Sequence, residues 1–277
     1  MHRRTTVVVL AVALLVGACS SGGSDTARTT TTSGAPSTAA AGDSLSIVVT
    51  NDDGIGAPGI DVLVKALSAI PGVQVAVVAP LDNKSGTSDR STSGPVDHAA
   101  AQTASGVAGT AVAGFPADAV TVALDDLGLT PDLVVSGVNQ GQNLGPIAYV
   151  SGTVGAARTA ARRGIPAVAA SAGVGAGADY AAAAALVVAW IGDHRAALLA
   201  GTATTDTVTS FNVPDCALGG KPKKLLEVPL AATIPDGVDL TKSDCSVVPA
   251  KAPADDIAAL IAGYAAETLV PLEEIEH

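Results

Sequence analysis

The chain has 277 residues, of which 48% are hydrophobic and only 2% aromatic, so we expect small aliphatic residues to build its core. About 230 residues remain once an N-terminal leader and linker are set aside, which is enough for one α/β domain. The formal net charge of −11 and the pI near 4.6 argue against a nucleic-acid polymer as a partner, because such a partner calls for a basic face.

The first 18 residues have the features of an export signal. MHRR supplies positive charge, and TTVVVLAVALLVGA is an apolar stretch too short to span a bilayer comfortably. The end of this stretch, LVGAC, resembles a bacterial lipobox, which implies cleavage before Cys19 and lipidation of that residue. The alternative is an ordinary secretory signal followed by a chance cysteine. We therefore predict an exported protein, lipid-anchored at the outer face of the bacterial cell membrane.

Residues 19–43 are rich in Ser, Thr, Gly and Ala and contain almost nothing to bury. Such a composition is typical of a flexible tether. The sequence thus predicts three parts: a signal peptide at 1–18, a tether at 19–43 and a folded domain at 44–277.

The folded part alternates between apolar runs and helical patterns. Short apolar runs predict strands at residues 47–50, 73–80, 131–137 and 165–171. Helices are predicted from Pro58 to a stop at Pro71-Gly72, and at residues 116–128, 151–164 and 179–200. Residues 81–95 form a polar loop that is long for a mere connector. This rhythm predicts a three-layer α/β/α sandwich with a mostly parallel, Rossmann-like sheet, which binds ligands beyond the carboxyl ends of its strands.

Three polar stretches follow predicted strands: NDDG at 51–54, NKSGTS at 83–88 and SGVNQGQNLG at 136–145. They offer carboxylate, hydroxyl and amide oxygens, without histidine or cysteine, which suits Mg²⁺, Mn²⁺ or Ca²⁺ rather than zinc. A divalent cation would also offset the repulsion between the adjacent carboxylates of Asp52 and Asp53. Taken singly, each stretch has a plainer interpretation as a turn, a loop or a backbone cap.

Together, the wording and order of six segments resemble the SurE family, the stationary-phase survival nucleotidases. The segments are TNDDGIGAPGI, VVAPLDNKSGTS, GFPADAV, PDLVVSGVNQGQNLG, VSGTVGAAR and GIPAVAAS. The resemblance covers residues 47–171 closely and fades after them. It implies a SurE-like fold.

The resemblance also implies site residues. Its metal ligands would be Asp52, Asp53, Ser85 and Asn139, which would hold one divalent cation per site, with Mg²⁺ or Mn²⁺ as the first candidates and Ca²⁺ as a further one. Its phosphate- and substrate-binding residues would be Asn51, Gly86, Asn143, Ser151, Gly152 and Thr153. The last three open a predicted helix, whose free amides and partial positive charge suit a phosphate group. Ser151 or Thr153 can equally serve as an N-cap, and a cap can also hold a ligand.

The implied activity is metal-assisted hydrolysis of nucleoside 5′- (and 3′-) monophosphates to nucleoside and phosphate. Asp52 and Asp53 would be the catalytic residues, as base or as nucleophile. Two alternatives remain open: a non-catalytic nucleotide- or metal-binding lipoprotein, and a broad-range acid phosphatase. The resemblance further implies a homodimer.

Four other polar residues carry charge or can ionise and are weaker candidates for the site. Lys84, beside Ser85, and Arg158, on the helix after the phosphate segment, are candidate cations for an anionic ligand. His98 and His194 have no partner set that indicates catalysis, so we expect neither to take part.

We also predict a disulfide between Cys216 and Cys245. If Cys19 carries lipid, these two are the remaining thiols of a protein sent to an oxidising compartment. The bridge would stabilise the domain by about 3 kcal/mol on the chain-entropy estimate. The alternative is two separate buried thiols.

Overall fold

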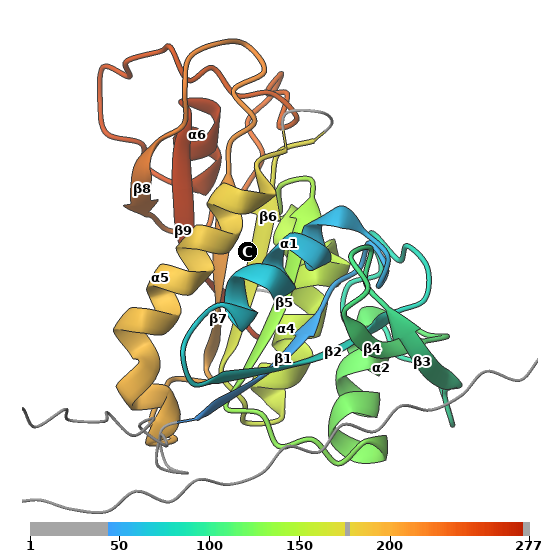
Figure 1. Cartoon of the computed structure of the whole chain (residues 1–277). Helices are drawn as coiled ribbons and strands as arrows, with labels where there is room; N and C mark the ends of the chain where they lie inside the picture. Colours follow the sequence, from blue (N-terminus) through green and yellow to red (C-terminus); the bar gives the residue numbers. More distant parts are fainter. Residues whose placement is uncertain (1–43, 175–177, 274–277) are drawn as a thin grey trace, which may run out of the picture. The chain divides into compact units, whose positions relative to one another are not determined.

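The computed structural model describes residues 44–174 and 178–273 (Figure 1). The predicted signal peptide, the tether and Cys19 lie outside these residues. The described part contains nine strands: β1 (Leu45–Thr50), β2 (Val73–Pro80), β3 (His98–Gln102), β4 (Ala108–Val112), β5 (Leu133–Gln140), β6 (Ala167–Ala172), β7 (Thr207–Val213), β8 (Lys223–Glu227) and β9 (Tyr264–Pro271). It also contains seven helical elements: α1 (Pro58–Ser68), α2 (Pro116–Thr121), the π-helical turn η1 (Val122–Asp126), α3 (Ile147–Val150), α4 (Gly152–Arg162), α5 (Tyr180–Leu199) and α6 (Asp256–Ile261).

The nine strands form one sheet in the order β3-β4-β2-β1-β5-β6-β7-β9-β8. The six from β4 to β7 in this order run parallel to one another. At one edge β3 pairs antiparallel with β4, and at the other β9 pairs antiparallel with β7. Because the central strands are parallel, the carboxyl ends of β1, β5 and β6 meet at one edge of the sheet, where α/β proteins bind ligands.

Helices cover both faces of this sheet. On one face α1 and α5 pack together over a core that includes Ile47, Val49 and Val135. On the other face α2 and α4 pack together over Val48 and Val134. The alternation of Ile47, Val48 and Val49 between two cores is what a central strand buried on both faces requires. The predicted three-layer α/β/α sandwich with a mostly parallel sheet is therefore confirmed.

The predicted elements before residue 172 match the structure to within a few residues, apart from the helix predicted at 116–128. That segment divides into α2 and η1. Strands β3 and β4 were missed, because their sequences, HAAAQ and AGTAV, are rich in alanine and poor in the branched residues that signal a strand. The short elements β8 and α6 were missed as well.

Helix α5 is long and apolar enough to cross a membrane by length and composition alone. It packs on the sheet through Ala183, Ala184, Val187 and Ile191, as a core helix of an α/β domain does. Together with Leu198 these are the buried residues of α5, so its place in the fold accounts for the apolar side chains of one face.

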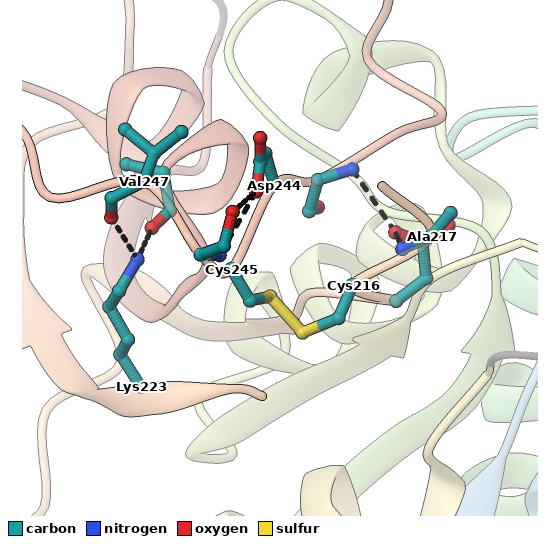
Figure 2. The surroundings of a disulfide bond; sticks show 10 residues. Cys216, Ala217, Lys223, Asp244, Cys245 and Val247 are labelled. Carbon is teal, nitrogen blue, oxygen red and sulfur yellow. Dashed lines mark hydrogen bonds between the residues drawn. A yellow bond between two sulfur atoms is a disulfide. The ribbon is translucent and has the colours of Figure 1, made fainter. Parts of the chain in front are cut away.

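The region between β7 and β9 is held by the disulfide between Cys216 and Cys245 (Figure 2). Their Cα atoms are 5.2 Å apart, so the expected pairing is present. Next to it, the Cys245 amide donates to the Gly219 carbonyl (2.8 Å), and Lys223 Nζ donates to the Val247 carbonyl (2.7 Å). The bridge thus joins the segment that leaves the sheet after β7 to the loop that leads to α6.

Candidate active site

The turn after β1 presents Asp52 and Asp53 side by side. Asn51 closes this turn: its Nδ2 donates to the Gly54 carbonyl (2.9 Å), and its Oδ1 accepts from the Gly54 amide (3.2 Å). Asn51 is fully buried. Asn51 is one of the residues predicted to bind substrate. In the structure, its side chain instead shapes the turn that holds the two carboxylates.

Asp52 is only 2% exposed and lies against the start of α4. Its Oδ1 accepts a hydrogen bond from Thr153 Oγ1 (2.5 Å). Burial raises the pKa of Asp52 to about 6; the hydrogen bond from Thr153 opposes this rise, and the neighbouring Asp53 adds to it. The site therefore stabilises the ionised carboxylate less well than water does, and Asp52 is a weaker acid than an ordinary aspartate.

Asp53 is held by two donors. Asn83 Nδ2 donates to its Oδ1 (3.1 Å), and the Gln140 amide, at the end of β5, donates to its Oδ2 (3.0 Å). Burial raises the pKa of Asp53 despite these hydrogen bonds. Within residues 44–174 and 178–273, no basic side chain forms an ion pair with Asp52 or Asp53.

Asn139 comes from the carboxyl end of β5, where the pairing with β6 shifts register between Ser136 and Asn139. Such a bulge re-aims a side chain. Asn139 Nδ2 donates to the Gly141 carbonyl (2.6 Å), whereas its Oδ1 is buried without a hydrogen-bond partner. A buried amide oxygen without a partner is costly, and this atom is free to accept a ligand. Together with two uncompensated carboxylates, it matches the oxygen-donor set of a hard divalent cation.

Ser85 and Gly86 lie on the exposed part of the loop after β2. The Ser85 amide donates to Asn83 Oδ1 (3.0 Å), so Asn83 links this loop to Asp53. The Ser85 hydroxyl makes no hydrogen bond to the described residues. Lys84 anchors the loop through its backbone amide, which donates to the Asp52 carbonyl (2.6 Å). The structure therefore brings the loop of Ser85 to the two aspartates, as the resemblance implied.

The start of α4 closes the site. Ser151 is the N-cap, and its Oγ accepts from the Val154 amide (3.1 Å). A Cβ placed on Gly152 would lie 2.8 Å from Asp52 Cβ, so only glycine lets the helix approach so closely. The hydroxyls of Ser151 and Thr153 are thus committed to the cap and to Asp52. What remains for a phosphate is the set of amides and the partial positive charge at the helix start.

Asn143 belongs to a buried polar group that the sequence did not reveal. Its amide donates to Asn212 Oδ1 (2.7 Å), and its Nδ2 donates to Ser171 Oγ (2.9 Å). Asn212 Nδ2 returns a hydrogen bond to the Asn143 carbonyl (3.2 Å). Asn212 lies in the segment FNVPD near the end of β7. Its position near the end of a strand is the feature of the sequence that could have indicated its place in this group. The group fixes the loop after β5 to β6 and β7.

The remaining candidates lie apart from the aspartates. Arg158 Nε donates to the Leu272 carbonyl and its Nη2 donates to Asp89, whereas its Nη1 is buried without a hydrogen-bond partner among the described residues. His194 stacks on Trp190 with ring centroids 4.1 Å apart, and His98 lies on the edge strand β3. Among the described residues, no three His, Cys, Asp or Glu side chains cluster as a metal site. A cation would therefore rely on the mixed oxygen set described above.

A cavity of about 570 Å³ lies elsewhere, along β9. Pro146, Tyr149, Leu230 and Leu269 are among its lining residues, and none of the expected ligands is. Its walls are mostly apolar, so it is unsuited to the phosphate chemistry of the aspartate site.

Comparisons with known proteins identify relatives of the chain. The sequence model of the family described as "Survival protein SurE" matches residues 47–229. A Halobacterium salinarum protein named 5′-nucleotidase SurE is 51% identical over 135 residues, which are 47% of this chain and 47% of that protein. The chain thus spans about half the length of this relative.

Two further matches cover more. A Geotalea daltonii protein, also named 5′-nucleotidase SurE, is 37% identical over 191 residues, which are 68% of this chain and 71% of that protein. The crystal structure of the SurE protein from Aquifex aeolicus superimposes with a TM-score of 0.64 at 25% identity, covering 83% of this chain and 95% of that one. The match in structure extends well beyond the segments that carry the sequence motifs.

Proposed function

Because this chain belongs to the SurE family, we propose that it is a metal-dependent phosphomonoesterase that converts nucleoside 5′- and 3′-monophosphates to nucleoside and phosphate. The names of its relatives support the nucleotidase activity. The observation that carries the metal dependence is the buried, unpartnered Oδ1 of Asn139 beside two uncompensated carboxylates.

Asp52, Asp53, Asn139 and Ser85 would hold one divalent cation, which is Mg²⁺, Mn²⁺ or Ca²⁺. All four supply oxygen atoms, which these hard cations prefer. The chemistry supplied by such a cation is polarisation of a phosphoryl oxygen and activation of a water molecule.

The chain's own groups would perform the other steps. The amides at the start of α4 bind the phosphate and place phosphorus next to Asp52 and Asp53. Thr153 fixes the orientation of Asp52 through a 2.5 Å hydrogen bond, and Asn83 fixes that of Asp53. One of these two carboxylates would accept a proton from the attacking water while the bond between phosphorus and the nucleoside oxygen breaks, and would pass that proton to the nucleoside oxygen. In the alternative, the carboxylate attacks phosphorus and displaces the nucleoside oxygen, which takes a proton from solvent, and water then hydrolyses the acyl phosphate to release phosphate. Asn143 acts indirectly, because it holds the loop that directly follows Asn139 at the end of β5.

Phosphate release from a panel of substrates tests this proposal. The panel contains nucleoside 5′- and 3′-monophosphates and simple phosphate esters, each assayed with Mg²⁺ or Mn²⁺ and again after addition of chelator. We expect metal-dependent release from the nucleotides in preference to the simple esters. Absence of release with every metal would indicate a binding lipoprotein without turnover. Equal release from all esters would indicate a broad-range phosphatase.

We further propose that the protein is exported and lipid-anchored through Cys19. The disulfide supports this location, because such bonds persist mainly in oxidising compartments. Labelling with a clickable fatty acid tests it: the parent should carry the label and Cys19→Ala should not. A labelled Cys19→Ala variant would exclude the anchor.

A homodimer is also proposed. Strand β8 pairs with β9 only as far as Glu267, so the last residues of β9 have an open edge, with Leu269 57% exposed beside the apolar cavity. Open strand edges next to apolar surface favour association. Light scattering at micromolar concentration should give twice the chain mass, and a monomer would contradict the proposal.

A further inference from the structure

The loop that carries Ser85 is fixed at both ends although its middle is exposed. At its start, the Lys84 amide donates to the Asp52 carbonyl (2.6 Å). At its end, the Ser88 amide donates to the Val150 carbonyl (3.0 Å), and Ser88 Oγ donates to the Tyr149 carbonyl (2.5 Å). The loop also presses on α4: a Cβ on Gly155 would lie only 2.1 Å from the Ser88 carbonyl oxygen. Helix α4 is therefore the surface against which this loop is placed.

Asp89, the next residue, is gripped by two arginines one helical turn apart on α4. Its Oδ2 accepts from Arg158 Nη2 (3.1 Å) and from Arg162 Nη1 (2.7 Å). Partial burial alone would raise the pKa of Asp89, but Arg162 and Arg158 together hold it below its ordinary range. Asp89 is thus a charged anchor at the end of the Ser85 loop.

The same arginines hold a third segment. Arg158 Nε and Arg162 Nη2 both donate to the Leu272 carbonyl (2.9 and 2.5 Å), just after β9, and Arg162 Nε pairs with Glu273 (3.1 Å). The Arg158 side chain is only 6% exposed. A buried guanidinium is expensive unless its partners are in place, so the two segments depend on each other through α4.

We propose that Asp89, held by Arg158 and Arg162, is a positioning residue that keeps Ser85 at the cation site and ties the Ser85 loop to the end of β9. At its start, α4 orients Asp52 through Thr153, and two turns later it holds Asp89. One rigid helix thereby sets the distance between ligands that lie 33 positions apart in the sequence, Asp52 and Ser85. This inference rests on the proposed cation site but not on the identity of the substrate.

The test compares Asp89→Asn and Arg162→Gln with the matched control Arg163→Gln. Arg163 is adjacent on the same helix and pairs with Asp125 (2.6 Å) on the surface, so the control removes the same charge and one ion pair. Mn²⁺ binding to the full chain is followed by loss of the free-ion electron paramagnetic resonance signal, without substrate. Groups that support metal ligands typically contribute 10–100-fold to metal affinity, so we expect Asp89→Asn and Arg162→Gln to raise the Kd roughly tenfold. Arg163→Gln should leave it within about twofold.

Hydrogen exchange of the amides of residues 85–88 provides a second measurement, independent of metal. In Asp89→Asn and Arg162→Gln these amides should exchange about tenfold faster, which corresponds to about 1.4 kcal/mol, and in Arg163→Gln at the parent rate. The effect of the double variant should be smaller than the sum of the two single effects, because both single changes remove the ion pair between Asp89 and Arg162. Asp89→Glu, which keeps the charge, should recover part of the affinity.

The outcomes separate this inference from the proposed function. If the parent binds Mn²⁺ and Asp89→Asn binds it equally tightly with unchanged exchange, the positioning role is refuted whatever the parent hydrolyses. If the variants differ from the parent as expected, but the parent releases phosphate from no nucleotide, the proposed function fails and the positioning role stands. A parent that binds no Mn²⁺ would overturn both.

Discussion

Asp52→Asn should make the metal-free protein more stable while it removes metal binding and turnover. In the folded chain the pKa of Asp52 is raised from 3.8 to about 6, chiefly by burial. Each unit of such a shift corresponds to 1.36 kcal/mol, so the ionised carboxylate costs the folded state about 3 kcal/mol at neutral pH. The raised pKa already includes the hydrogen bond from Thr153, which favours the ionised form, so no separate deduction applies to an amide that cannot ionise. The expected gain is about 3 kcal/mol, or roughly 6–12 °C in Tm for a domain of this size.

The sign of the pH dependence follows from the raised pKa. The folded state binds the Asp52 proton more tightly than the unfolded state, so parent stability falls as pH rises from 3.8 to about 6 and then levels off with respect to this group. The advantage of Asp52→Asn should therefore be small near pH 4 and complete above about pH 6. Calorimetry in chelator across this range measures it. Asp193→Asn, the same change at an exposed position of α5, is the control and should stay within about 0.5 kcal/mol of the parent.

Added Mn²⁺ should reverse the order of the two proteins. A ligand at about one thousand times its Kd stabilises the folded state by about 4.1 kcal/mol, and only the parent should gain this. The reasoning fails if Asp52→Asn is the less stable protein in chelator at neutral pH, or if its advantage does not change with pH. Metal-dependent hydrolysis by Asp52→Asn would refute the site itself.

Three further predictions concern stability and loop placement. Asp61 accepts hydrogen bonds from three residues, which outweigh the effect of burial and hold its pKa below the ordinary range. Asp61→Asn should therefore lower the free energy of unfolding in urea by about 2 kcal/mol at pH 7, and this difference should shrink below about pH 4. Cys216→Ser should lower the free energy of unfolding by about 3 kcal/mol and leave kcat unchanged, since the disulfide contacts none of the proposed ligands; a large loss of kcat would contradict this. Gly155→Ala should displace Ser88 and destabilise the protein by about 1–3 kcal/mol, whereas Gly192→Ala, with open space around it on α5, should stabilise it by about 0.5–1 kcal/mol; equal effects would refute the close approach of the loop.

The aspartate site could be predicted because local pattern and topology agree there. Residues 47–50 form a buried strand, and a buried strand that ends in NDDG must place Asp52 at its carboxyl end. The second such strand places Asn139 at the same edge, since both strands belong to a parallel sheet. Neither inference needs the identity of any distant partner.

What could not be predicted was which distant groups meet. Asn143 pairs with Asn212, and Arg158 with Asp89, each across 69 positions. Local patterns carry no information on such pairs. The sequence around an arginine on a helix is the same whether its distant partner is a ligand or a protein carboxylate. The same limit applies to β3, which is a strand because β4 lies beside it rather than through its own residues.

The composition of α4 follows from these long-range contacts rather than from helix formation. Glycine destabilises a helix interior by up to about 1 kcal/mol relative to alanine, yet α4 has Gly155 in its interior, and its first residue is Gly152. At both positions another segment lies too close to leave room for a side chain. A Cβ built on Gly152 would lie 2.8 Å from Asp52, and a Cβ built on Gly155 would lie 2.1 Å from Ser88. The two contacts bring the carboxylate and the Ser85 loop onto one helix face, and the arginines of the next turns hold the loop there. The glycines make α4 intrinsically less stable, but they let Asp52 and the Ser85 loop approach it closely. Such a departure from local preference is expected where the placement of site residues matters for function.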